Sequence, residues 1–292
     1  MLGNLIKAEF RKTTTTGLWW GLMIPTVLLA FGWALGTGAI FTSVSEFMSS
    51  DEAEELALLL GVEDPTQWQM SLFGMARSIN VATIFPMIFG GLAISNEINR
   101  KTITTTFLTA PTRVSAMAAK MIVYIVWGAI FGIAIVASVS IGIALTSDAG
   151  ALPDPAGWLA LAAVGVLASI LMTMFGVGVG ALMTSVVGTT VVLLLYVLIV
   201  ENGIQLVLAS QGLPEIIGFL PNGAVNGLTG SVASSLFLAN AGVVPDDLVD
   251  GLRAIAGALG AFDWWLSGLI FLAWTALFFL GGWATTQRKD IT

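Results

Sequence analysis

The residues able to do chemistry in this chain are few and of a restricted kind. Its 292 residues include no histidine and no cysteine. Acid/base work by imidazole, thiolate chemistry, disulfides and zinc sites with His or Cys ligands are therefore excluded. The phosphate-binding pattern G-x-x-x-x-G-K-[ST] is also missing from the sequence, so the chain lacks that route to nucleotide hydrolysis. We predict that the chain is not an enzyme and has no catalytic residue, metal site or cofactor of its own.

Charged residues inside apolar runs would mark an ion path or a proton relay, and here they are nearly absent. Glu201 is the one candidate, because it directly follows the apolar run 186–200. We expect a solvated residue at the membrane boundary; a functional buried carboxylate is the alternative. A carrier coupled to protons or sodium would have few groups to work with.

The stretch 96–120, NEINRKTITTTFLTAPTRVSAMAAK, is a compact basic connector between two apolar runs. It contains four of the eleven Lys and Arg residues, although the whole chain has a net charge of −7. We expect Glu97 to pair locally with Arg100 or Lys101, as oppositely charged residues three or four apart on a helix do.

A short helix is predicted inside this connector, ended by the Ala-Pro-Thr sequence at Pro111. It would place Ile103, Phe107 and Leu108 on one side, as an apolar edge flanked by charge. Such an edge suits docking into a groove of another protein. An ordinary basic loop whose apolar residues dip into the membrane interface is the alternative.

The composition indicates that these residues are held by membrane-spanning helices. The chain is 57% hydrophobic and 10% charged, with a mean hydropathy of +0.93, which is far from a soluble domain. A crossing needs about 20 apolar residues. We therefore predict an all-α, polytopic single membrane domain, with a break at 184–190 dividing the long apolar block. The six predicted spans are 18–40, 79–95, 121–146, 158–183, 186–204 and 264–285.

Charge predicts the orientation, because cytoplasmic loops are enriched in Lys and Arg. With the N-terminus inside, nine of the eleven basic residues are cytoplasmic, and the acidic residues gather in the exterior segments 41–78 and 205–263. We therefore expect a multi-pass protein of the cell (inner or plasma) membrane with both termini in the cytoplasm.

Segments outside the spans are expected to be helical as well. Residues 1–16 have the pattern of a basic amphipathic helix on the inner membrane surface; a frayed basic leader is the alternative. The acidic segment 41–78 is predicted to contain a helix around 52–60. Residues 203–220 are predicted to form a short re-entrant or interfacial helical hairpin, with a plain amphipathic exterior helix as an equal alternative.

Glycines at helical spacing predict close helix packing rather than a dinucleotide turn. The clearest case is the sequence GVGVG at 176–180, inside a predicted span. The pairs Gly32/Gly36 and Gly128/Gly132 have the same spacing.

The connector and the overall layout together resemble the membrane (permease) subunits of type-2 ABC exporters. In that family an acidic residue, a basic Thr-containing segment, a proline, a basic residue and a lysine link the second and third spans. The residues of this sequence that match are Glu97, Arg100, Lys101, Thr102, Pro111, Arg113 and Lys120. The basic N-terminal helix, the six spans and the sequence LPEIIGFLPNGAVNGL before the last span also fit, so the resemblance covers essentially the whole chain.

The resemblance implies that the connector 96–120 contains a coupling helix, which fits a cleft on a separate ATP-binding subunit. It implies two copies of that subunit, which bind ATP and Mg, and a second permease subunit, identical or paralogous. Membrane lipids are further partners, and nucleic acid is not expected. The residues expected to couple to the ATPase are Glu97, Arg100, Lys101, Thr102, Ile103, Phe107, Pro111 and Arg113.

The resemblance also suggests a substrate path between the second and fifth spans at the dimer centre. Phe85, Phe89, Leu194 and Leu198 are its candidate residues, and they suit the core equally well. The implied function is export of a hydrophobic or amphipathic substrate such as a drug, an antibiotic or a lipid. A non-transporting membrane anchor or sensor subunit and an ATP-independent carrier are the competing functions.

Overall fold

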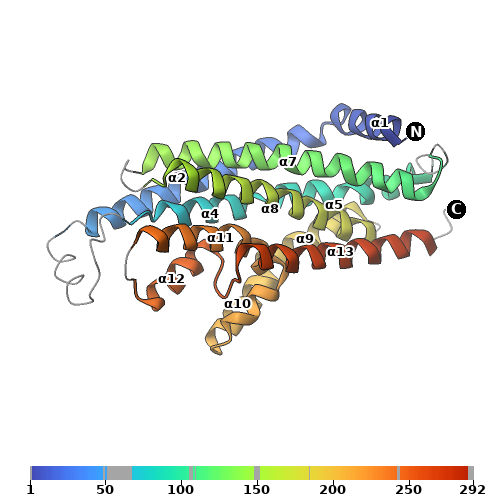
Figure 1. Ribbon diagram of the computed structural model, residues 1–292. Helices are drawn as coiled ribbons and strands as arrows, with labels where there is room; N and C mark the ends of the chain where they lie inside the picture. The colour runs from blue at the N-terminus through green and yellow to red at the C-terminus, as the bar shows by residue number, and fades with distance from the viewer. Residues whose placement is uncertain are drawn as a thin grey trace.

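The protein is an elongated helical bundle whose long helices run side by side along its length (Figure 1). The computed structural model describes residues 2–48, 50, 68–104, 108, 110–147, 152–183, 185–241 and 244–288. The secondary structure of these residues is entirely helical, which confirms the all-α fold class for this part of the chain. Helix α1 and the last turns of α13 lie at the same end of the bundle.

The described residues form helices in the following order along the chain. They are α1 (Leu2–Thr15), α2 (Leu18–Met48), α4 (Ser71–Ala82), α5 (Ile84–Asn99), α7 (Arg113–Thr146), α8 (Pro155–Leu182), α9 (Val186–Leu195), the π-helix η3 (Tyr196–Val200), α10 (Glu201–Ser210), the 3₁₀ helix η4 (Pro214–Phe219), α11 (Pro221–Asn240), α12 (Asp246–Ala256) and α13 (Trp264–Arg288).

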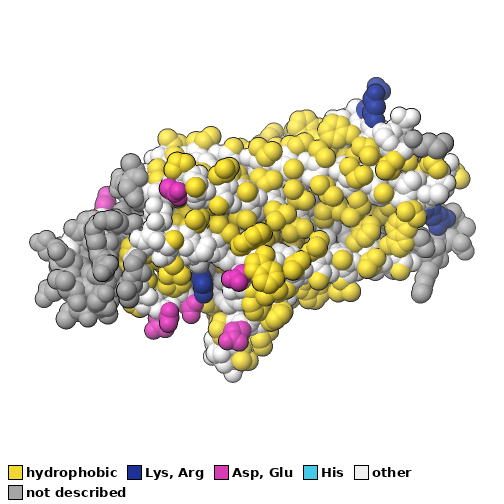
Figure 2. Space-filling model, viewed as in Figure 1, with side chains coloured by type: hydrophobic (Ala, Val, Ile, Leu, Met, Phe, Trp, Pro, Cys, Tyr) yellow, Lys and Arg dark blue, Asp and Glu magenta, His cyan; other side chains and the backbone are white. Residues whose placement is uncertain are grey.

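Within the described ranges, six helical stretches are long and apolar enough to cross a membrane. They are Leu18–Val44, Ser71–Asn99, Arg113–Thr146, Pro155–Leu182, Val186–Ser210 and Trp264–Ala284. Their exposed side chains form the broad apolar surface that Figure 2 shows along the bundle. The chain therefore has the character of a multi-pass membrane protein.

All six stretches differ in their bounds from the expected spans, and the second, third and fifth differ most; the third begins at Arg113 instead of 121. The second begins at Ser71 and is divided at Thr83 into α4 and α5. Pro86 accounts for the division, because it cannot donate a backbone hydrogen bond to the residue four positions earlier. Helix α4 therefore includes residues 71–78, which were expected in the exterior segment 41–78. Ten of its twelve residues are buried, so this part of the chain belongs to the bundle. The helix expected around 52–60 lies outside the described residues.

The fifth stretch continues to Ser210, past the expected end at 204, and Glu201 has an unexpected place in it. The Glu201 side chain is 0% exposed, so it is not the solvated boundary residue that we favoured from the sequence. Its carboxylate accepts hydrogen bonds from the backbone N–H groups of Asn222 (2.9 Å) and Gly223 (2.7 Å). The first turn of a helix has free N–H groups, so Glu201 caps α11 from another helix.

Residues 203–220 do not form a separate hairpin in this structure. Helix α10 completes the fifth stretch, η4 reverses the chain, and α11 then packs against α4, α8 and α13. Most of α11 is buried, because small residues along its length let neighbouring helices approach closely. Helix α12 follows it, ending at Gly257, whose φ of 78° is the left-handed conformation typical of a helix end.

Close packing of α5 against α8 sits at the centre of the bundle. A Cβ atom added at Gly176 would lie 2.0 Å from the Met87 carbonyl oxygen, and one added at Gly180 would lie 2.0 Å from the Gly91 oxygen. The packing role predicted for the 176–180 glycines is therefore confirmed. A Cβ atom added at Gly128 or Gly132 would likewise lie 2.8 or 2.9 Å from a Cα atom of α8.

The corresponding prediction for Gly32 and Gly36 is wrong among the described residues. A Cβ atom at either position would meet no atom within 4 Å. The spacing of small residues is common in membrane helices, and it does not by itself say which face meets a neighbour.

We predict that Gly176→Ala lowers the free energy of unfolding by about 3 kcal/mol, because overpacking forces the two helix backbones apart. Gly203→Ala is the matched control, since a Cβ atom there meets nothing within 4 Å; it should be neutral or slightly stabilising. Unfolding in mixed micelles measures both. Equal stability of the two variants would contradict this account of α5–α8 packing.

A second prediction concerns the cap on α11. Glu201→Ala leaves two backbone N–H groups without their acceptor, so we expect a loss of about 2–4 kcal/mol in the free energy of unfolding. Glu215→Ala removes an exposed carboxylate from nearby η4 and should change stability by less than about 0.5 kcal/mol. A Glu201→Ala variant as stable as Glu215→Ala would refute the capping role.

Candidate functional site

The basic connector begins with a tight reversal at the end of α5. Arg100 closes the helix, its side-chain Nε donating to Asn96 Oδ1 at 3.0 Å. Lys101 has a φ of 57°, a conformation that costs a residue with a Cβ about 1–2 kcal/mol. The next residue, Thr102, donates its backbone N–H to the Glu97 carbonyl oxygen at 3.0 Å. The connector therefore leaves α5 in a defined direction.

Glu97 is the structural centre of this region, and its ion pairs are long-range. We expected a local pair with Arg100 or Lys101; the ion pairs found join Glu97 Oε1 to Lys12 of α1 and to Lys120 of α7, the latter at 2.6 Å. The cause is the direction of the side chain, which points into the bundle and is 5% exposed.

Lys120 lies between two carboxylates. Its Nζ bonds to Glu9 Oε1 as well as to Glu97, and the Lys12 ammonium lies 3.8 Å from Glu9 Oε2. Lys120, Glu97 and Glu9 are 3%, 5% and 9% exposed. Two acids and two bases balance in charge, as burial of ionised groups requires. We call these four residues the ionic cluster.

Aromatic contacts hold α1 beside the ionic cluster. Trp127 of α7 donates its indole N–H to Thr13 Oγ1 at 2.9 Å. The Phe10 and Trp127 rings stack with centroids 5.8 Å apart, and Trp19 also packs on Trp127. Helix α1 is thus docked on α7 by charge, a hydrogen bond and ring contacts together.

Some of the predicted coupling residues are exposed, and others are buried. Arg100, Lys101, Thr102, Pro111 and Arg113 are exposed. Ile103 is buried in the core cluster with Met117, so it does not contribute to an exposed apolar edge, whereas Leu108 is 82% exposed. Phe107 lies outside the described residues. Thr112 begins α7 with a capping box to Ser115.

Reasoning from the sequence missed three members of the ionic cluster as a set. The sequence pattern indicates Glu9 and Lys12 only as part of a basic amphipathic helix, and Lys120 only as the lysine that opens a span. A signal was present: Glu9 is the one acid in a basic helix, and Lys120 lies within an apolar stretch, where an unpaired charge is costly.

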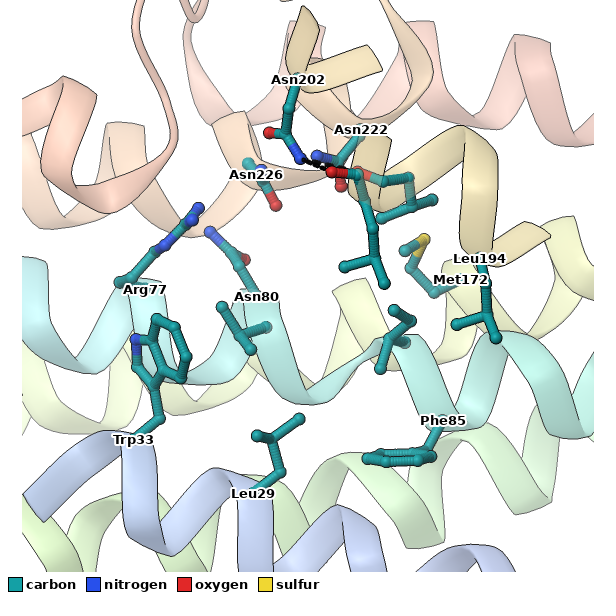
Figure 3. Close-up of a pocket in the computed structure, with 14 residues that line it drawn as sticks. Leu29, Trp33, Arg77, Asn80, Phe85, Met172, Leu194, Asn202, Asn222 and Asn226 are labelled. Atoms are coloured by element: carbon teal, nitrogen blue, oxygen red, sulfur yellow. Dashed lines mark hydrogen bonds between the residues drawn. The ribbon is translucent and has the colours of Figure 1, made fainter. Parts of the chain in front are cut away.

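A second feature is a pocket of about 400 Å³ between α2, α4, α5, α8, α9, η3, α10 and α11 (Figure 3). Three of the four residues expected on the substrate path line it, namely Phe85, Leu194 and Leu198. Phe89 does not. Its ring packs in the core against Tyr124 and Phe131, with centroids 5.1 and 5.2 Å away.

Polar groups line one edge of this pocket. Its remaining lining residues are Leu29, Trp33, Arg77, Asn80, Val81, Ile84, Met172, Val197, Asn202, Asn222 and Asn226. In Figure 3, Arg77 and the four asparagines lie on one side, and Leu29, Phe85 and Leu194 face them from the other. The volume is within the range of small-molecule sites.

We predict that Lys120→Met lowers the free energy of unfolding by about 3–5 kcal/mol, because it leaves buried carboxylates without their cation. Lys7→Met, an exposed change on α1, is the control and should change it by less than about 0.5 kcal/mol. The chain has no cysteine, so a spin label on Gly3→Cys can report α1 directly. The label should become more mobile in the Lys120 variant; unchanged mobility and stability would contradict the docking role.

Comparison with known proteins assigns no family to this chain. No protein-family model matches it, and no curated protein matches it. The described residues themselves show two features from which a function can be argued: an ionic cluster that ties the basic connector to α1 and α7, and an amphipathic pocket beside the fifth apolar stretch.

Proposed function

We propose that this chain is the membrane-spanning permease subunit of an ATP-driven exporter of the type-2 ABC kind, powered by a separate ATPase subunit. The single observation that carries the proposal is the ionic cluster. Glu97 ends α5, Lys120 lies near the start of α7, and both bond to residues of α1. The connector between α5 and α7 is therefore clamped at its base.

A clamp of this kind suits the transmission of force. An ATPase that moves the exposed part of the connector would move the ends of α5 and α7 with it, because buried ion pairs resist separation. The glycine contacts between α5 and α8 would pass the motion on, since their backbones touch without flexible side chains between them. Several spans would then tilt together between inward- and outward-facing states.

The distribution of charge supports a cytoplasmic position for the connector. In Figure 2, Lys and Arg side chains stand out at the end of the bundle that holds α1, and acidic side chains lie toward the other end, with a basic side chain among them. Exposed lysine and arginine near spans favour the cytoplasmic side. In this orientation both termini and the connector face the ATPase.

The proposed assembly supplies the nucleotide-binding pattern that the sequence does not contain, and it covers the apolar surface that the fifth stretch exposes. ATP and Mg would bind to two copies of the partner subunit. A second permease subunit, identical or paralogous, would face the fifth apolar stretch, of which only 11% is buried within this chain. The apolar lining of the pocket supports a hydrophobic or amphipathic substrate, such as a drug, an antibiotic or a lipid, and surrounding lipids would contact the remaining apolar surface.

The test is to purify the chain together with a candidate ATPase subunit. Charge reversal at the connector, Arg100→Glu with Lys101→Glu, should weaken assembly at least about tenfold, because it removes charges at the proposed interface. Glu97→Gln should still assemble but lose most of the coupling, measured as substrate-stimulated ATPase activity, because the clamp is opened. Asp246→Lys with Asp247→Lys, an exposed double change on α12, should leave both measurements unchanged.

Several outcomes would overturn the proposal. One is labelling of Lys101→Cys by an impermeant maleimide from outside intact cells. A second is a wild-type pair that fails to associate. A third is flux in liposomes without the ATPase, which would indicate an ATP-independent carrier. An assembled pair that moves no substrate would instead indicate an anchor or sensor subunit.

A further inference from the structure

The pocket contains a cation that no carboxylate of the described residues neutralises. Arg77, on α4, is half-buried and has no Asp or Glu oxygen within 4.0 Å in the described part of the chain. A guanidinium beside an apolar wall gains little solvation and is expected to seek an anion. Its five N–H groups suit a carboxylate or a phosphate.

Asn226 lies next to Arg77 and has an unmet hydrogen-bonding group. Its side chain is 3% exposed, and its Oδ1 accepts no hydrogen bond from the described residues. A Cβ atom placed on Gly257 would lie 2.4 Å from Arg77 Nη1 and 3.2 Å from Asn226 Nδ2. The Arg77 Nη1 and Asn226 Nδ2 nitrogens therefore lie close together beside Gly257, and Figure 3 shows the two side chains as neighbours at the edge of the pocket.

Two other amides of this edge, Asn80 and Asn202, are already used. Asn80 donates to the Ala256 carbonyl oxygen at 3.2 Å and accepts from Thr229 at 2.7 Å. Asn202 donates to the carbonyl oxygens of Val197 and Leu198 at 2.9 Å. Since buried polar groups nearly always have partners, the Arg77 guanidinium, which has no carboxylate partner among the described residues, marks the place of an anionic headgroup.

We propose that the pocket binds an anionic amphiphile, with its carboxylate or phosphate head accepting hydrogen bonds from the Arg77 guanidinium and from the Asn226 Nδ2 group beside it. The apolar body lies along Leu29, Phe85 and Leu194 on the opposite wall. A free single-chain acid and an anionic membrane lipid share this chemistry. That such a ligand is the cargo rests on the proposed export function; its binding does not.

The experiment measures binding of 11-(dansylamino)undecanoic acid to the full chain in non-ionic detergent, by fluorescence. The methyl ester of the same probe has the same apolar body without the charge. We expect the acid to bind at least about tenfold more tightly than the ester, the size expected for a hydrogen bond to a charged group. Arg77→Gln should remove this difference, and Arg77→Lys should retain part of it.

Two controls separate the site from general effects. Arg253→Gln also removes an arginine, but Arg253 bonds to Ser234 and Asp250 outside the pocket, so the preference for the acid should persist. Leu198→Trp fills the apolar side and should weaken acid and ester alike. Competition by phosphatidylglycerol against phosphatidylcholine then identifies the source: displacement of the acid by the anionic lipid alone indicates a bilayer lipid, and no displacement by either a free acid.

Equal binding of acid and ester by the wild type would overturn the inference, as would an Arg77→Gln variant of wild-type stability that keeps the preference. Neither result depends on a partner ATPase. A charge-selective pocket in a chain that recruits no ATPase would leave the binding site standing and the proposed export function refuted. Coupled ATPase activity without charge selectivity would leave the proposed export function standing and refute the anionic binding site.

Discussion

The structure depends on the neutralisation of one buried lysine. Lys120 is placed within an apolar helix, where an isolated ammonium group would be too costly to keep charged. Glu9 and Glu97 meet this requirement from two other helices. The consequence is architectural, because satisfying Lys120 docks α1, orients the end of α5 and defines where the connector starts.

Two buried glutamates of this chain illustrate how surroundings determine the role of a residue. Glu97 meets lysine ammonium groups and joins three helices by charge. Glu201, in α10, accepts hydrogen bonds from backbone N–H groups and so caps the start of α11. Near Glu201 the fifth stretch changes to the π-helix η3, whose looser turn is often found at functional positions. The pocket with Arg77 lies beside this turn.

The helices differ in how firmly they are held, and this difference bears on the proposed transport. In the most apolar 18 residues of the second stretch, 83% are buried, whereas in those of the fifth stretch only 11% are buried. The second stretch carries the glycine contacts and the Glu97 clamp, so it suits the role of a rigid lever. The fifth has most of its surface free for lipid or for a second subunit. The pocket lies between these two unequal elements.

The sequence by itself determined the helical class, the number of apolar stretches and the basic connector, because hydropathy and charge are local properties that a window of residues reveals. It also indicated the packing role of Gly176 and Gly180. Only the tertiary structure decided that Lys120 pairs with Glu9, that Glu201 caps α11, and that Arg77 and Asn226 lie close together while Phe89 turns into the core. These facts depend on which faces of distant helices meet. One sequence spacing is compatible with several such arrangements, as the open faces of Gly32 and Gly36 demonstrate.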